Sequence, residues 1–219
     1  MARANTDKLH PDAVAAKARV VTIIDSVSPT ELVEAIKRAP SLRGMILGYI
    51  AEEMFEKHVL GALPGASKIR KHDDHDRSMN KSDRDFVFGG RRYSIQLKSI
   101  QTNSIAYDPA SEVLCADVQN DGSDRRTVLL PNGQRVETTN YVIGDYDILA
   151  VPLFPFTGTW TFAYKRNRDC RLTDSKKYSE ENRQYLLSTI EKLTYPLRPP
   201  WVSDLRLLLD DTIGECVSE

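Results

Sequence analysis

One stretch, SDRDFVFGGRRYSIQLKS at positions 82–99, constrains the fold more than any other part of this chain. Two runs of alternating apolar and polar residues flank Gly89-Gly90, which is typical of a β-hairpin with a two-residue turn. Pairing outward from this turn sets residue 85 opposite residue 94, and residue 83 opposite residue 96. Because side chains alternate along a strand, one face is apolar and packs the core, and the other is polar. The polar face holds Asp83, Asp85, Ser94, Gln96 and Lys98.

The segment before the hairpin, residues 1–61, is predicted to be helical. Apolar residues recur at helical spacing over 11–25 and over 42–60, and Ser28 supplies an N-cap for a further short helix. Gly61 is the expected stop of the helix over 42–60. The polar stretch 62–81, which contains KHDDHDRS, is predicted to be a solvated loop in preference to a zinc site.

The segment after the hairpin is predicted to extend the sheet. Strands are expected over 112–119, 125–130 and 134–142, with Asn132-Gly133 as a second hairpin turn, and another strand over 159–165. The apolar run over 146–154 is typical of a strand covered on both faces. Helices are expected over 178–219. Helices, then a mixed sheet, then helices predict one α/β domain over 1–219.

The amino-acid composition excludes some classes of protein but indicates no particular function. With 219 residues, 41% hydrophobic and 28% charged, the chain is typical of a globular protein, and its net charge of -1 favours no class of partner. Three widely spaced cysteines predict neither a disulfide framework nor a metal knuckle. No apolar stretch is typical of a leader or a membrane helix, so we expect a cytoplasmic protein without a membrane partner.

The polar face of the hairpin carries residue types suited to one kind of chemistry. Carboxylates beside an amide oxygen form an all-oxygen site of the kind that Mg²⁺ prefers. A lysine two residues beyond the amide is suited to orient or activate a water molecule and to stabilise charge on a phosphate. The face therefore predicts metal-dependent phosphodiester hydrolysis, and the alternative is a solvated outer face of a half-exposed hairpin.

The segment RDFVFGGRRYSIQLKS resembles the core hairpin of the PD-(D/E)XK nuclease superfamily, with Asp85 matching the motif aspartate and Gln96-Leu97-Lys98 the triplet. The resemblance spans roughly residues 42–165 and is greatest to type II restriction endonucleases. It implies a restriction-endonuclease-like α/β core over 82–165, with a mixed central sheet flanked by helices and an extra β-meander at about 108–141.

The resemblance also implies an activity. The implied activity is the Mg²⁺-dependent hydrolysis of double-stranded DNA by a sequence-specific restriction enzyme. Mn²⁺ would be able to substitute for Mg²⁺. Asp85 and Gln96 would hold the metal together with Glu52 or Glu53 from the preceding helix, and Asp83 would lie behind them or serve as an alternative metal ligand. Lys98 would position or activate the water. Gln96 departs from the usual Glu or Asp. Two alternatives therefore stay open: a structure-specific repair or recombination nuclease, and a DNA-binding protein with an inactive nuclease core.

Basic clusters and the meander supply the expected DNA contacts, since a nuclease needs cations beside phosphates and polar groups beside bases. The residues predicted to bind DNA are Lys68, Arg70, Lys71, Lys165, Arg166, Arg168, Arg135 and Asn140. A homodimer is expected, because enzymes of this kind that cut palindromic sites share their two-fold symmetry. A cognate DNA methyltransferase is expected as a genetic neighbour.

Overall fold

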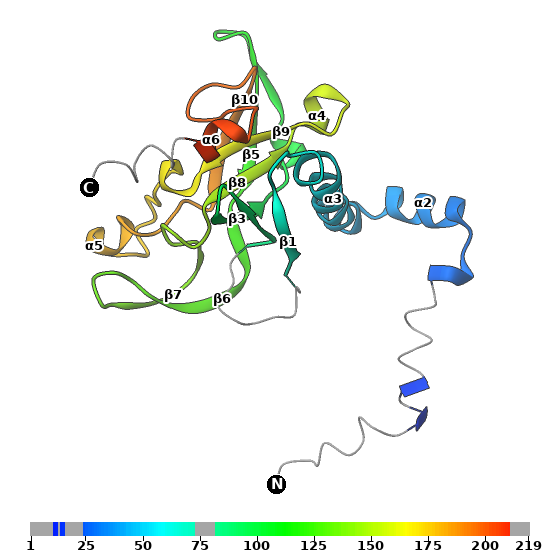
Figure 1. The fold of residues 1–219 in the computed structure, drawn as a ribbon, viewed down its shortest axis with the longest axis horizontal. Helices are drawn as coiled ribbons and strands as arrows, with labels where there is room; N and C mark the ends of the chain where they lie inside the picture. The colour runs from blue at the N-terminus through cyan, green and yellow to red at the C-terminus, as the bar shows by residue number, and fades with distance from the viewer. Residues whose placement is uncertain (1–10, 13, 16–23, 73–81, 211–219) are drawn as a thin grey trace. The chain divides into compact units, whose positions relative to one another are not determined.

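The computed structural model describes residues 11–12, 14–15, 24–72 and 82–210 (Figure 1). The chain divides into two compact units, Met1–Leu47 and Gly48–Glu219. Helix α3, Pro40–Phe55, begins in the first unit and continues into the second. Each unit is described by itself below, and the single domain expected over 1–219 stays a prediction.

The N-terminal helices follow their sequence signals closely. Helix α2, Pro29–Arg38, begins at Ser28 with a capping box, in which Ser28 Oγ accepts from the Glu31 amide (3.2 Å) and Glu31 Oε2 accepts from the Ser28 amide (2.8 Å). Helix α3 and the π-helical turn Glu56–Leu60 together span the predicted 42–60, and Gly61 caps them. Of the helix predicted over 11–25, residues 13 and 16–23 lie outside the described residues, and Ile24–Ser26 forms a 3-10 turn.

A mixed five-stranded sheet in the order β1-β2-β3-β8-β9 forms the centre of the second unit. Its strands are β1 Ser67–Lys71, β2 Arg84–Phe88, β3 Arg91–Leu97, β8 Ile148–Pro152 and β9 Phe162–Arg166. Strands β3 and β8 are parallel, and the other neighbours are antiparallel. The hairpin register is as predicted, with Asp85 opposite Ser94, so the predicted α/β class with a mixed central sheet is confirmed.

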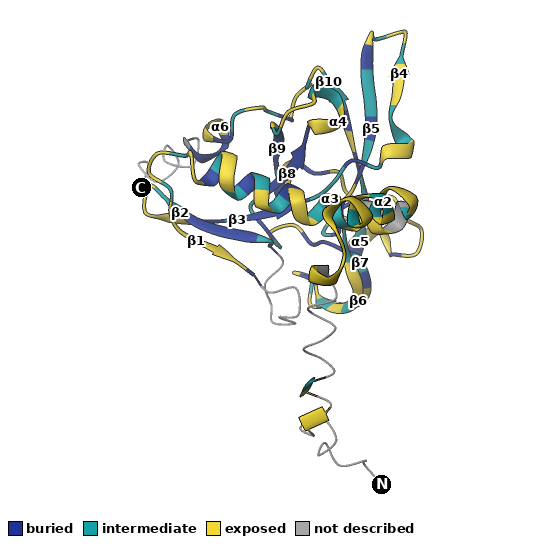
Figure 2. Cartoon of the chain, turned by 90° about the vertical axis from the view of Figure 1, so that its right-hand side faces the viewer, coloured by how far each residue is buried: buried dark blue, intermediate teal, exposed yellow. Residues whose placement is uncertain are grey.

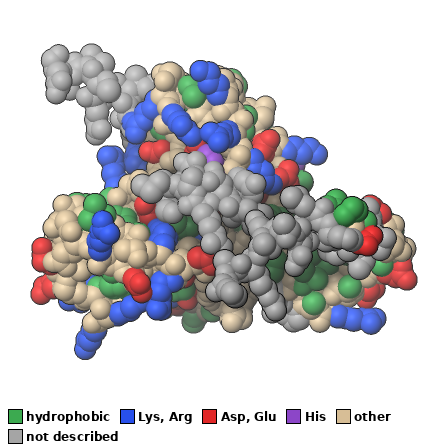
Figure 3. All heavy atoms as spheres, turned by 90° about the horizontal axis from the view of Figure 1, so that it is seen from below, with side chains coloured by type: hydrophobic (Ala, Val, Ile, Leu, Met, Phe, Trp, Pro, Cys, Tyr) green, Lys and Arg blue, Asp and Glu red, His purple; other side chains and the backbone are tan. Residues whose placement is uncertain are grey.

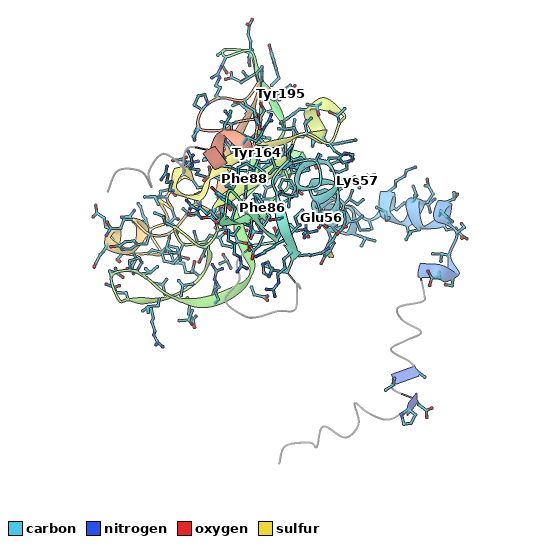
Figure 4. The ribbon with its side chains drawn as sticks, viewed as in Figure 1. Glu56, Lys57, Phe86, Phe88, Tyr164 and Tyr195 are labelled. Atoms are coloured by element: carbon cyan, nitrogen blue, oxygen red, sulfur yellow. The ribbon has the colours of Figure 1, made fainter. Side chains whose placement is uncertain are left out.

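Strand β8 is buried along its whole length, as its apolar sequence predicts (Figure 2). Ile148 and Ala150 belong to one hydrophobic core, which also contains Phe86 and Tyr164 and receives Phe55 from α3. Figure 4 shows Phe86, Phe88 and Tyr164 near the centre of this unit. Leu149 and Val151 belong to a second core on the opposite face of the strand. The sheet therefore has one core on each side.

The segment predicted as a β-meander contributes β5 to a three-stranded sheet in the order β10-β5-β4 and forms the two-stranded ribbon β6-β7. Their bounds are β4 Ala106–Asp108, β5 Val113–Gln119, β6 Asp121–Leu129, β7 Arg135–Asn140 and β10 Ile190–Tyr195. The turn between β6 and β7 contains Asn132-Gly133, and Gly133 has φ +81°, a conformation that favours glycine. Figure 1 shows the ribbon as a pair of long curved strands.

Two segment predictions are wrong. Over the described residues 178–210 the expected helices reduce to α5, Glu180–Arg183, and α6, Arg206–Asp210, and the part of that prediction over 211–219 lies outside the described residues. Between these two helices β10 pairs with β5 and alternates buried with exposed side chains, because tertiary pairing outweighs helix propensity there. The loop expected over 62–81 contains strand β1, whose five residues are all exposed at the sheet edge and so carry no apolar alternation. Residues 73–81 lie outside the described residues.

The remaining short elements are helix α4, Phe154–Thr157, and the 3-10 turns Thr102–Ser104 and Asn167–Asp169. Within the described residues, no helix combines the length and the apolar character needed to span a membrane.

Candidate functional site

Asp83 and Gln96 meet at the open end of the hairpin. Strand β2 begins one residue after Asp83, so the Leu97 amide faces the Asp83 carboxylate instead of a strand carbonyl and donates to it (2.7 Å). Gln96 Nε2 donates to the same carboxylate oxygen (2.6 Å). The side chain that lies against Gln96 is therefore that of Asp83, as the register requires, and not that of Asp85.

Lys98 lies just beyond the end of β3 and close to this pair. Its backbone amide donates to the Ala150 carbonyl (3.0 Å), which fixes the main chain beside β8. Its ammonium lowers the pKa of Asp83, although burial acts more strongly and raises that pKa overall. Asp83, Gln96 and Lys98 thus form one cluster on the polar face of the hairpin.

Glu52 of α3 approaches the same cluster from the helix. Burial raises the pKa of Glu52, and the charge of Asp83 raises it further. Two carboxylates within electrostatic range of each other in a half-buried place repel when both are ionised. Glu53, by contrast, is exposed and its pKa is lowered, mainly by its hydrogen bond from Lys71 (2.7 Å). Of the two helix glutamates left open by the sequence, Glu52 is the one beside Asp83.

Arg84 is a residue that the sequence reasoning missed. Its side chain is fully buried and donates to three carboxylates of the helix: Nε to Glu56 (2.9 Å), Nη1 to Glu52 (3.1 Å) and Nη2 to Glu53 (3.3 Å). Nη1 also donates to the Asp83 carbonyl (3.0 Å). Arg84 thereby connects the helix to the hairpin. The signal was an arginine at a core-facing position of an alternating strand, which requires acidic partners nearby.

Asp85 has a different set of partners. His72 Nε2 lies 2.7 Å from its carboxylate, Ser82 Oγ donates to it (2.8 Å), and Arg92 makes a charged hydrogen bond with it. Burial alone would raise the pKa of Asp85, but these hydrogen bonds together outweigh burial and lower the pKa. Asp85 therefore connects β1, β2 and β3, and its oxygens are already engaged by protein donors.

Five of the residues predicted to bind DNA are exposed: Lys68, Arg70, Lys71, Arg135 and Arg168. Lys68 has φ +51° and lies at a bulge in β1, where the pairing register with β2 shifts. A bulge redirects neighbouring side chains, and a non-glycine residue at positive φ marks local strain. Lys71 is exposed but paired with Glu53, and Arg166 is half-buried and donates to the Leu208 carbonyl (3.3 Å).

Two of the residues predicted to bind DNA, Lys165 and Asn140, are buried. Lys165 is buried in β9, where its ammonium donates to the buried carboxylate of Glu191 (2.5 Å). Asn140 is buried at the end of β7, and its Nδ2 donates to the Leu187 carbonyl (2.7 Å). Both side chains point inward because their strands bury those positions, and both serve the fold.

One face of the molecule carries both signs of charge. Figure 3 looks onto one face of the molecule, on which Lys and Arg side chains alternate with Asp and Glu side chains. Among the described residues, no group of three His, Cys, Asp or Glu side chains is arranged to hold a metal ion.

The fold and the cluster together define a mixed α/β protein with an acidic, amide and lysine site at the open end of its central hairpin. No protein-family model and no curated protein matches the chain. Among solved structures it is similar to a bacterial homing endonuclease, I-Ssp6803I, at 16% identity and a TM-score of 0.36, over 78% of this chain and 95% of that one. A likeness of this size assigns neither a family nor a function.

Proposed function

We propose that this protein is a Mg²⁺-dependent endonuclease that hydrolyses phosphodiester bonds in double-stranded DNA, of the sequence-specific restriction type. One observation carries the proposal: Asp83, Gln96 and Lys98 meet on the polar face of the hairpin, with Glu52 of α3 beside them. Asp83 replaces Asp85 as the proposed carboxylate partner of Gln96, since the oxygens of Asp85 are engaged by His72, Ser82 and Arg92.

The donor groups present fit a hard divalent cation. Asp83 and Glu52 supply carboxylate oxygens, and rotation of the Gln96 amide by half a turn would present its oxygen in place of the nitrogen that now faces Asp83. The raised pKa values of Asp83 and Glu52, due first to burial, identify a place where a positive charge would relieve repulsion. A bound Mg²⁺ or Mn²⁺ would supply Lewis-acid stabilisation of phosphate oxygens and a source of hydroxide.

The remaining chemistry belongs to the chain itself. Lys98 would orient or deprotonate the attacking water and stabilise charge on the phosphate. Arg84 would keep Glu52 beside Asp83 through its hydrogen bond. Lys68, Arg70, Arg135 and Arg168 are exposed and free to meet DNA phosphates or bases. A homodimer would place two such sites on the two strands of a palindromic sequence, and a cognate methyltransferase would protect the host DNA.

A second function is supported by one observation. Gln96 presents its amide nitrogen to Asp83, and an amide brings no charge to a cation. A site with one formal charge fewer than usual suits a protein that binds DNA without cutting it. The two functions differ in whether DNA is cleaved, and not in where it binds.

Cleavage of plasmid DNA tests both functions. Supercoiled plasmid incubated with the protein and Mg²⁺ is expected to give discrete linear fragments, and EDTA is expected to stop cutting. Lys98→Ala should lower the rate by about 10²–10⁴-fold, the usual contribution of a positioned acid or base, while DNA binding is retained. Tight binding without cutting in Mg²⁺ or Mn²⁺ would establish the binding function instead. Lys98→Ala cutting at the wild-type rate would refute the site.

Salt dependence of DNA binding tests the placement of the basic residues. A cation that contacts a phosphate releases one counterion, so Arg168→Ala and Lys68→Ala should each reduce the slope of log K against log salt by about 0.9. Lys192→Ala is a suitable control, because Lys192 is exposed but pairs with Asp117 on the β10-β5 sheet. An unchanged slope in both Arg168→Ala and Lys68→Ala would remove these two residues from the interface.

A further inference from the structure

Two groups from the β-meander contact the ammonium of Lys98. Lys98 Nζ donates to the carbonyl oxygen of Asp121, the first residue of β6, at 2.8 Å. It also contacts Tyr141, the residue that follows β7: Nζ lies 5.3 Å from the ring centroid, and Lys98 lowers the pKa of the tyrosine hydroxyl. The two strands of the ribbon therefore meet at the lysine, one at its first residue and the other just after its last.

Tyr141 is held firmly where it contacts Lys98. Its side chain is 5% exposed, and its ring packs edge-on against Tyr146 with the centroids 5.3 Å apart. Its backbone carbonyl accepts from the Leu187 amide (2.8 Å). On another side, the guanidinium of Arg126 lies 5.3 Å from the ring centroid and is itself fixed by Asp145 (2.7 Å). A hydroxyl on so fixed a ring is an acceptor at a defined position.

Tyr141 also lies within electrostatic range of the proposed metal-binding carboxylate. Burial raises the pKa of Tyr141, Lys98 opposes that rise, and the charge of Asp83 adds to it. Tyr141, Lys98 and Asp83 therefore belong to one electrostatic group, although Tyr141 lies more than forty residues beyond the hairpin in the sequence.

We propose that Tyr141 is a positioning residue for Lys98, and that the β-meander supplies two fixed acceptors, the Tyr141 hydroxyl and the Asp121 carbonyl, which orient the lysine toward the bond to be cut. The inference rests on the proposed nuclease function. A lysine ammonium has three N–H donors. With two of them bonded to the meander, the third is directed toward substrate, and the long flexible side chain is confined to one orientation before DNA binds. Preorganisation of this kind acts on the rate of the chemical step and not on substrate affinity.

Removal of the hydroxyl alone tests this role. Tyr141→Phe keeps the ring that packs on Tyr146, so the fold is retained. The single-turnover rate of plasmid cleavage in Mg²⁺ is expected to fall by about 10–100-fold, the size of effect produced by small misplacements of catalytic groups. The dissociation constant for the same DNA, measured with Ca²⁺ in place of Mg²⁺, is expected to change by less than about threefold, since positioning affects chemistry and not binding.

A neighbouring tyrosine offers a matched control. The Tyr146 hydroxyl is also buried and hydrogen-bonded, but it donates to Asn120 Oδ1 (2.9 Å) and makes no contact with Lys98 among those described. Tyr146→Phe is therefore expected to lower the thermal midpoint while leaving the cleavage rate within about threefold of wild type, because its hydrogen bond serves the fold.

The outcomes separate this inference from the proposed function. A wild-type protein that does not cut DNA in Mg²⁺ or Mn²⁺ would overturn the nuclease function and the inference with it. A wild-type protein that cuts, with Tyr141→Phe cutting at the same rate, would overturn the inference alone. The inference also fails if Tyr146→Phe slows cleavage as much as Tyr141→Phe, or if Tyr141→Phe weakens DNA binding by as much as it slows cleavage.

Discussion

Asp83→Asn is expected to abolish DNA cleavage and, in the absence of divalent cations, to make the protein more stable at neutral pH. The carboxylate is proposed to hold the metal, so its loss should lower the rate by about 10³-fold or more. The same carboxylate is strained in the metal-free protein, because burial raises its pKa by more than Lys98 and the hydrogen bonds from Leu97 and Gln96 lower it. Asparagine keeps an oxygen for the Leu97 amide and removes the charge. A stabilisation of about 0.5–2 kcal/mol is typical when a strained functional group is neutralised.

The pH dependence of this gain has a definite sign. A carboxyl group whose pKa is higher in the folded than in the unfolded protein destabilises the fold when ionised, and the penalty disappears as the pH falls through the folded pKa. The increase in the midpoint of thermal unfolding caused by Asp83→Asn should therefore be largest at neutral pH and should vanish under acid conditions. Thermal unfolding of wild type and variant in EDTA over a series of pH values measures it.

Asp85→Asn is the matched comparison and should behave in the opposite way. The pKa of Asp85 is lowered, so its ionised form stabilises the fold above the unfolded pKa, and that contribution is lost as the pH falls through the folded pKa. Loss of its charged hydrogen bonds should cost about 1.5–3 kcal/mol at neutral pH. If Asp83→Asn destabilises the metal-free protein, or if Asp85→Asn alone abolishes cleavage without loss of stability, the assignment of the two aspartates is reversed.

Arg84→Met is expected to produce the largest loss of stability of any single change at the site. Arg84 is fully buried, and its guanidinium holds Glu52, Glu53 and Glu56 of the helix against β2. Methionine fills much of the volume but leaves these carboxylates without their shared cation. Removal of one partner from a buried charge group costs about 3–5 kcal/mol. Urea unfolding, followed by circular dichroism, measures the change in the free energy of unfolding.

Two further variants determine whether charge or packing is responsible. Arg91→Met removes an arginine whose side chain is 52% exposed and whose nearest carboxylate oxygen, in Asp147, is 3.8 Å away, so it should change stability by less than about 1 kcal/mol. Adding Glu52→Gln to Arg84→Met should recover part of the lost stability, because it removes one of the unpaired charges. Failure of Glu52→Gln to recover any stability would show that Arg84 acts by packing alone.

The parts of the fold that the sequence predicts are those in which local pattern and tertiary environment agree. Alternation around Gly89-Gly90 determines the hairpin register, and a continuous apolar run determines β8, because burial on both faces requires it. Strand β10 was missed because its residues IEKLTY follow a helix start at Ser179 and owe their extended form to pairing with β5, more than seventy residues earlier. No local signal encodes such a partner.

In the candidate site, too, some relations between residues follow from the sequence and others do not. Alternation places Asp83 opposite Gln96, and that relation follows from the sequence alone. The difference between Asp83 and Asp85 does not follow from the sequence, because it depends on which donors surround each carboxylate. Two donors to Asp85 come from outside its strand: His72 follows β1, and Arg92 belongs to β3. The burial of Lys165 could not be predicted either, because a cluster of basic residues in the sequence does not reveal the distant buried carboxylate, Glu191, with which Lys165 pairs.

The two ends of the ribbon β6-β7 are expected to differ in how well they tolerate substitutions. Its base contacts the lysine through Asp121 and Tyr141, whereas its turn at Asn132-Gly133 lies at the far end of both strands. The turn contacts α5, where Asn132 Nδ2 donates to Asn182 Oδ1 (2.9 Å), and not Lys98, so replacements at the turn are expected to act on α5 and to leave the base in place. A deletion of a single residue at the base would shift the acceptors of Lys98 by one position along the strand. Under the proposed function, a change of target preference is therefore expected from substitutions at the tip of the ribbon and not from substitutions where it joins the sheet.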